Sequence, residues 1–205
     1  MKAIAIIPAY SHIDHRLQAA LLEAHVPFVP LHGCSDLPKV RSQLITLALE
    51  RAEERVLFID ADIVPSPEQV RALAESQLVT RERALTGLYP IRDRRATAAG
   101  GRGWAVDAVE PELADEALIF EARWAGLGFA AIHVDSLRRV AETLPLVEWP
   151  EMSWKPFCVP LVEGRTYYPD DRVLWHRLAQ TGTRLIASNQ LRVGHVASVV
   201  LTSVV

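Results

Sequence analysis

Residues 55–65, RVLFIDADIVP, carry the most informative pattern in this sequence. The uninterrupted apolar run Val56–Ile59 is typical of a strand that is buried on both faces of a parallel sheet. Asp60 and Asp62 follow it directly, although ionised carboxylates resist burial unless they are paired or coordinate a metal. The two acids therefore form either a solvated turn before a helix or a functional site, and the strand before them favours a site.

Strands and helices alternate around this stretch. We predict strands at Lys2–Ile7 and Val26–Leu31, and each is followed by a segment with apolar residues at helical spacing. Ser11 as an N-cap, Pro38 in a first turn and Ser66 as an N-cap mark the expected starts of three helices. The alternation predicts right-handed βαβ units, so the fold class is α/β, with a mostly parallel central sheet flanked by helices.

The second half of the chain is less regular. Strands are predicted at Ala84–Leu88, Ala117–Trp124 and Phe129–His133, and helices at Ser136–Leu144 and Asp171–Ala179. Residues 91–103 hold four arginines and three glycines without apolar periodicity, which indicates a mobile loop. Length alone gives no reason to divide the 205 residues, so we expect one domain spanning 1–205.

Composition and charge restrict the class of protein. Half of the residues are hydrophobic and 23% are charged, as in an ordinary globular protein. The net charge of −3 predicts no general attraction to nucleic acid or to an anionic membrane surface. Cys34 and Cys158 have no disulfide-framework or zinc spacing, so a reducing, cytoplasmic setting is expected.

The two ends of the chain carry short apolar runs. The start, MKAIAIIPAY, is too short and too weakly charged for a secretory signal, and no apolar run approaches the ~20 residues of a transmembrane segment. The tail at 195–205, HVASVVLTSVV, leaves open a terminal strand, a dimer contact that would make a homo-oligomer, or a peripheral membrane contact. We favour the strand.

Asp60 and Asp62 are placed where a parallel sheet binds its ligands, beyond the carboxyl end of a strand. Two hard oxygen ligands suit Mg²⁺ or Mn²⁺, which take their remaining ligands from substrate phosphates. His195, in LRVGHV, makes chemical sense as a third ligand, although a lone histidine is more often structural.

A second acidic pair, Asp170 and Asp171, opens a predicted helix. Acids in a first helical turn are favoured by the helix dipole, so one of them satisfies that structural role and the other is available as a general base. Arg41 stands where a diphosphate at the sheet edge would need positive charge, beside Lys39, and both residues are equally compatible with a solvated surface.

The motifs occur in a characteristic order. They are IIPAY (6–10), VRSQLITLALERA (40–52), VLFIDADIVPSP (56–67), TGLYP (86–90), GLGFAAIHVDSL (126–137), YYPDDRVLWHRLAQTG (167–182) and RLIASNQLRVGHV (184–196). This ordered set resembles the GT-A-fold glycosyltransferases, in particular the small bacterial and phage-type relatives of family 2. The resemblance covers roughly Ala3 to Val196.

The resemblance implies a role for each matching position. It places Ala9 and Tyr10 near the nucleotide base of the donor, and it makes Asp62 the main metal ligand. The other implied positions are Asp60 as a ribose or metal contact, Gly126, Gly128 and Phe129 along the sugar and acceptor region, Asp171 as catalytic base beside Asp170, and His195 as a metal ligand. Asp170 stands where the family usually has Glu, and Ala9-Tyr10-Ser11 replaces the customary Thr-Tyr-Asn.

The function implied is metal-dependent transfer of a sugar from a nucleoside-diphosphate sugar, UDP- or GDP-linked, to an acceptor hydroxyl, with inversion if Asp171 is the base. The acceptor stays open between a glycan, a lipid-linked glycan, a natural product and a protein. Two alternatives remain, a nucleotidyl or phosphoryl transferase on a related fold and a non-catalytic nucleotide-sugar-binding protein. The chain lacks the glycine-rich phosphate loop that the first alternative predicts.

Overall fold

The computed structural model describes residues 2–33, 35–90, 104–110 and 117–196. Its helices are α1 (His15–Glu23), α2 (Leu37–Leu49), α3 (Pro67–Glu75), α6 (Val134–Thr143) and α7 (Asp170–Gln180). The strands of its main sheet are β1 (Ala3–Ala9), β2 (Phe28–His32), β3 (Arg55–Ile59), β5 (Arg83–Leu88), β6 (Val106–Ala108), β7 (Ile119–Ala125), β8 (Phe129–His133) and β11 (Arg184–Arg192). Two small ribbons pair β4 (Ile63–Val64) with β12 (Gly194–His195) and β9 (Leu161–Glu163) with β10 (Thr166–Tyr168).

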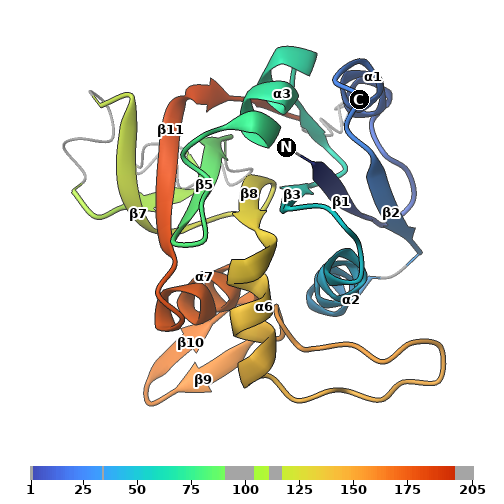
Figure 1. The fold of residues 1–205 in the computed structure, drawn as a ribbon, viewed down its shortest axis with the longest axis vertical. Helices are drawn as coiled ribbons and strands as arrows, with labels where there is room; N and C mark the ends of the chain where they lie inside the picture. The colour runs from blue at the N-terminus through green and yellow to red at the C-terminus, as the bar shows by residue number, and fades with distance from the viewer. Residues whose placement is uncertain (1, 34, 91–103, 111–116, 197–205) are drawn as a thin grey trace, which may run out of the picture.

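The central sheet has the strand order β2-β1-β3-β8-β5-β11-β7-β6 (Figure 1). Strands β2, β1 and β3 pair in parallel, and so do β5 and β11. Among the described strands of the sheet, only β8 and β7 run against the others, because β8 pairs antiparallel with β3 and β5, and β7 pairs antiparallel with β11 and β6. The predicted α/β class with a mostly parallel sheet is therefore confirmed.

Helices cover both faces of this sheet, and the alternation of side chains along β1 shows how. Ile4 and Ile6 belong to the core cluster that contains apolar residues of α2, α6 and α7. Ala5 and Ile7 belong to the other cluster, with apolar residues of α1 and α3. Successive residues of a strand point to opposite faces, so a continuous apolar run is required wherever helices pack on both sides.

Of the three helix starts that capping residues or a proline mark in the sequence, those of α2 and α3 agree with the structure and that of α1 does not. Ser66 caps α3 in a capping box with Gln69, as the pattern predicts. The prediction that Ser11 caps α1 is wrong, because Asp14 caps the helix and accepts a hydrogen bond from the Arg16 backbone N–H at 2.9 Å. The Ser11 hydroxyl instead lies 2.9 Å from Nδ1 of His12.

The β4–β12 ribbon places the end of the described chain next to the segment Asp60–Asp62. His195 pairs with Ile63 in antiparallel register, and the Val196 N–H donates to the Asp62 carbonyl at 2.9 Å. Neither this ribbon nor the β9–β10 hairpin was predicted, since two- and three-residue strands carry too little periodicity to detect.

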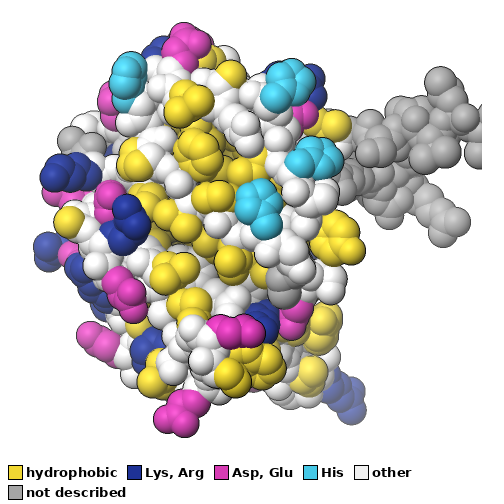
Figure 2. All heavy atoms as spheres, turned by 90° about the vertical axis from the view of Figure 1, so that its right-hand side faces the viewer, with side chains coloured by type: hydrophobic (Ala, Val, Ile, Leu, Met, Phe, Trp, Pro, Cys, Tyr) yellow, Lys and Arg dark blue, Asp and Glu magenta, His cyan; other side chains and the backbone are white. Residues whose placement is uncertain are grey.

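Figure 2 shows one face of the molecule, the right-hand side of Figure 1, where acidic and basic side chains are interspersed rather than gathered by sign.

In the part of the chain that the structure describes, no helix is long and apolar enough to cross a membrane. The predicted mobile loop at 91–103 and most of the apolar tail, 197–205, lie outside the described residues.

Candidate active site

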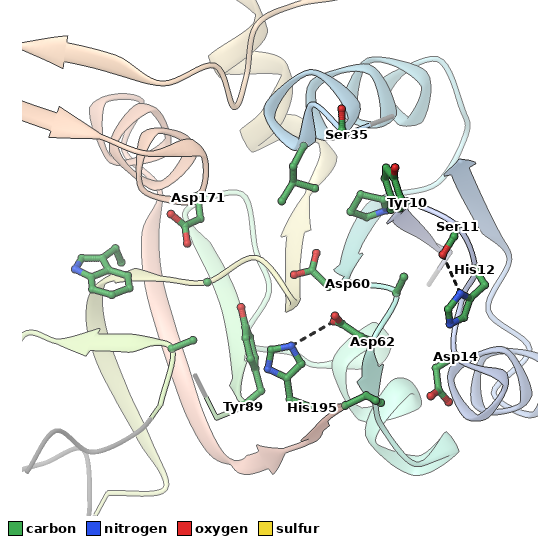
Figure 3. A pocket seen from close by; sticks show the side chains of 17 residues that line it. Tyr10, Ser11, His12, Asp14, Ser35, Asp60, Asp62, Tyr89, Asp171 and His195 are labelled. Carbon is green, nitrogen blue, oxygen red and sulfur yellow. Dashed lines mark hydrogen bonds and ion pairs between the residues drawn. The ribbon is translucent and has the colours of Figure 1, made fainter. Parts of the chain in front are cut away.

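A cavity of about 940 Å³ opens where β1 and β3 end (Figure 3). Its size falls within the range of ~300–1,000 Å³ that small-molecule sites usually have. Five of the residues that line it are Tyr10, Asp60, Asp62, Asp171 and His195. Residues that follow β3 and residues much later in the chain, Asp171 and His195, thus line one cavity. It lies at the sheet edge where α/β proteins bind ligands.

Asp62 and His195 face each other across the β4–β12 ribbon. Nε2 of His195 lies 3.3 Å from Oδ1 of Asp62, and Nδ1 lies 2.8 Å from the carbonyl oxygen of Pro90. A carbonyl only accepts, so Nδ1 carries a proton and donates it to Pro90. In the neutral ring Nε2 is then an acceptor that faces a carboxylate, which is favourable only with a proton or a cation between the two groups.

This pair fits a divalent cation. A histidine ligand typically donates its other ring N–H to a carbonyl or carboxylate, as His195 does to Pro90. Adjacent ligands of an octahedral ion with bonds of 2.0–2.1 Å lie about 3 Å apart, close to the Asp62–His195 separation of 3.3 Å. Asp62 and His195 would supply two ligands and leave the remaining positions to phosphate oxygens and water.

Asp60, which was predicted as a ribose or metal contact, is paired with Arg41 in the structure. Its two carboxylate oxygens accept hydrogen bonds from Nη2 of Arg41 at 2.8 and 3.0 Å. Among the described residues, no group of three His, Cys, Asp or Glu side chains is arranged to hold a metal. The structure therefore brings Asp62 and His195 together and ties Asp60 to a buried arginine.

Arg41 also binds Asp170 through Nη1, so one guanidinium joins the end of β3 to the start of α7. Only 5% of Arg41 is exposed, and the side chain lies beneath the cavity rather than along it. Burial opposes its charge, but the attraction of Asp60 and Asp170 outweighs burial and raises the pKa of Arg41. Arg41 thus positions two acids, because Nη1 and Nη2 each donate to a carboxylate, and the diphosphate contact considered for it remains a prediction.

Asp170 and Asp171 are adjacent in sequence but face different surroundings. Asp170 is paired with Arg41, whereas Asp171 lines the cavity and accepts a hydrogen bond from the Arg172 backbone N–H at 2.7 Å. Burial raises the pKa of the Asp171 carboxyl, and the nearby charge of Asp170 raises it further. A raised pKa makes a carboxylate more basic, and in a cavity this favours a role as general base.

Tyr89 explains why two glycines occur at 126 and 128. The Gly128 N–H donates to the Tyr89 hydroxyl at 2.9 Å, and the buried tyrosine lines the cavity. A Cβ atom on Gly126 would lie 1.9 Å from that hydroxyl oxygen, and one on Gly128 would lie 2.8 Å from the Tyr89 ring. Both positions must therefore lack a side chain for Tyr89 to occupy this place.

The other positions implied by the resemblance divide between cavity and core. Tyr10 lines the cavity and is 73% exposed, and Gly126 lines it as well. Ala9 is buried in the core cluster that includes α1. Phe129, expected along the sugar region, has a fully buried side chain in the same cluster and does not line the cavity, because β8 lies in the middle of the sheet.

The residue-level predictions missed Tyr89 and Trp124, which both line the cavity. Tyr89 lies in the TGLYP segment, directly after the carboxyl end of β5, and that position was a usable signal. Trp124 belongs to an antiparallel strand, so nothing in its local sequence indicated that it would face the cavity. Lys39, considered for a phosphate, instead lies with Nζ 4.0 Å from the ring centroid of Trp149.

Comparison with known proteins supports the fold. No protein-family model and no curated protein sequence matches the chain. The crystal structure of A197 from STIV is similar over 96% of this chain and 86% of that chain, with 19% identity and a TM-score of 0.63. The structure of GalNAc-T7 with UDP, GalNAc and Mn²⁺ is similar over 96% of this chain and 44% of that chain, with 11% identity and a TM-score of 0.57.

These similarities define the class of fold. GalNAc-T7 is a GT-A glycosyltransferase, and this chain spans less than half of its length. The chain has the GT-A fold, as the ordered motifs predicted.

Proposed function

We propose that the protein is a metal-dependent glycosyltransferase that moves a sugar from a nucleoside-diphosphate sugar to an acceptor hydroxyl. The observation that carries the proposal is the pairing of Asp62 with a His195 ring whose Nδ1 is fixed on Pro90, in the same cavity as Asp171. The similarity to a GT-A structure that contains UDP and Mn²⁺ supports this choice of ligand.

Asp62 and His195 would hold the cation, Mn²⁺ or Mg²⁺, on the donor side of the cavity. When bound, the cation supplies charge that stabilises the departing nucleoside diphosphate. Asp60 contributes indirectly, since its bond to Arg41 fixes the end of β3 from which Asp62 projects. Tyr10, with Ala9 behind it, is proposed to lie against the nucleotide base, because it is an exposed aromatic ring on the wall of the same cavity.

Asp171 is the proposed general base. Its carboxylate takes the proton of the acceptor hydroxyl, the hydroxyl oxygen bonds to the anomeric carbon, and the bond from that carbon to the diphosphate oxygen breaks with its electron pair leaving on the diphosphate. Attack from the side opposite the leaving group inverts the anomeric configuration. Asp170 assists by position alone, because it is paired with Arg41.

A thermal-shift screen of UDP- and GDP-sugars, each with and without Mn²⁺, tests the proposal. We expect at least one donor to stabilise the protein only when Mn²⁺ is present. Asp62→Ala and His195→Ala should abolish this shift, whereas Glu142→Ala, which changes an exposed acid outside the cavity, should preserve it.

Two other outcomes would contradict transferase function. If no nucleotide sugar shifts the Tm of the folded protein, the proposed glycosyltransferase function is wrong. Metal-dependent stabilisation by nucleoside triphosphates but by no nucleotide sugar would favour nucleotidyl transfer, the runner-up.

A further inference from the structure

Trp124 and Arg172 form a pair beside Asp171. Cζ of Arg172 lies 3.9 Å from the centroid of the Trp124 ring, which is within the range of a cation–π contact. Trp124 and Asp171 both line the cavity, and Arg172 is the next residue after Asp171 in α7. Arg172 itself is not among the lining residues, but its contact with Trp124 and its place next to Asp171 put the pair beside the cavity, near the proposed base.

The Arg172 guanidinium has hydrogen-bonding capacity that the described protein does not use. Within the described residues its side chain makes no hydrogen bond or ion pair, and the residue is exposed. Contact with the face of an aromatic ring occupies none of the five N–H donors of a guanidinium. Arg41 differs in this respect, because both terminal nitrogens of its guanidinium donate to carboxylates, Nη1 to Asp170 and Nη2 to Asp60.

The pairing with Trp124 matters for binding. A free arginine side chain loses rotamer entropy when it binds a ligand, and a guanidinium already held on a ring loses less. Because a planar guanidinium matches the oxygens of a carboxylate or phosphate, such a preorganised arginine is suited to an anion rather than to a neutral hydroxyl.

We propose that the acceptor is an anionic hydroxyl compound, whose carboxylate or phosphate binds Arg172 while its hydroxyl faces Asp171 and its carbon skeleton contacts Trp124. This inference rests on the proposed function and names its acceptor class. Asp171 and Arg172 are consecutive residues of α7, so an acceptor that carries both a hydroxyl and an anionic group on one small molecule suits the pair. A uronic acid or a sugar phosphate has this layout.

Matched acceptors test the inference with the donor found in the thermal-shift screen. Initial rates are measured for D-glucose, D-glucuronate and D-glucose 6-phosphate by release of the nucleoside diphosphate. We expect at least one anion to exceed glucose by ~10-fold or more in kcat/KM, the effect of one charge-assisted hydrogen-bonded pair. The two anions separate carboxylate from phosphate recognition.

The variants locate the effect. Arg172→Gln should bring the ratio of anion to glucose close to one, chiefly by raising KM for the anion, and Arg172→Lys should keep part of it. Arg138→Gln, which changes an exposed arginine on α6, should keep the wild-type ratio. Equal use of glucose and both anions by the wild type, or a preference that persists in Arg172→Gln, would overturn the inference.

If none of the three compounds accepts a sugar, equilibrium binding tests the inference instead. The three compounds are titrated by tryptophan fluorescence with and without Mn²⁺ and UDP. Anion binding that Arg172→Gln weakens ~10-fold supports the site, whereas no stronger binding of either anion than of glucose overturns it. If no nucleotide sugar stabilises the protein, the proposed function fails separately, and the titration without UDP still decides whether Arg172 binds anions.

Discussion

Asp171 is the residue on whose ionisation the proposed reaction depends. Burial and the charge of Asp170 raise its pKa, so the carboxylate gains its proton at a higher pH than an ordinary aspartate, whose pKa is 3.8. We therefore expect kcat to fall on the acid side through a pKa above 3.8. A pH–rate profile measured with saturating donor and acceptor checks this, and an acid limb at or below 3.8 would contradict the role of Asp171.

The raised pKa of Asp171 also predicts how the stability of the protein depends on pH. A folded-state pKa above the unfolded one means that the folded protein binds more protons in the window from 3.8 up to the folded pKa, so stability falls as pH rises through it. Asp171→Asn removes this penalty and should not lower the Tm at neutral pH, while transfer falls by ~10²–10⁴-fold. A variant that is both inactive and clearly less stable would indicate a structural role instead.

Gly126 and Tyr89 form a steric pair. A methyl group at 126 would overlap the Tyr89 hydroxyl, so Gly126→Ala should cost about 1–3 kcal/mol of unfolding free energy, as overpacked cores do. In a Tyr89→Phe background the closest overlap is absent, and the cost should be smaller. Urea unfolding of the two single variants and the double variant measures the coupling, and strict additivity would refute the contact.

At the scale of single elements, α1 depends on its cap. Asp14 accepts bonds from the backbone and side chain of Arg16, and these hold its pKa down to about 2. Asp14→Ala should cost about 1 kcal/mol, the usual value of an N-cap. Because the folded pKa is depressed, this contribution is complete above the ordinary value of 3.8 and is lost as pH falls toward 2.

Unfolding of wild type and Asp14→Ala measured at pH 7 and near pH 2 checks the sign. The difference between the two proteins should shrink at the lower pH. Asp14→Asn is the matched control, because asparagine caps helices as well as aspartate but does not ionise. A difference that is the same at both pH values would show that the cap does not act through its charge.

At the scale of the whole molecule, Arg41 joins α2, the end of β3 and the start of α7. Removing one partner of a buried ion pair leaves uncompensated charge, so Arg41→Met should lower the unfolding free energy by about 3 kcal/mol. Adding Asp170→Asn should recover part of this loss, because it removes one of the two uncompensated carboxylates. Denaturant unfolding of the cycle measures the recovery, and a double variant less stable than Arg41→Met would contradict the pairing.

Local sequence was sufficient for much of the fold. The run Val56–Ile59 predicted β3 within one residue, Phe129–His133 predicted β8 with its observed bounds, and Ser66 predicted the start of α3. These features depend on local sequence patterns, namely apolar periodicity and capping side chains, so they can be predicted without a structure. The position of Asp60 and Asp62 at a strand end followed from the same pattern.

The roles of the acidic residues, in contrast, depend on the folded chain. The two aspartates of one tripeptide separate, because Arg41 from α2 binds Asp60 whereas His195, more than 100 residues away, meets Asp62. Tyr89, Trp124 and Arg172 likewise acquire their places from contacts between distant elements. Local sequence alone was enough to locate the strand end that carries the candidate site. Which charged side chains pair with one another depends on their distance and burial, and both are properties of the folded chain.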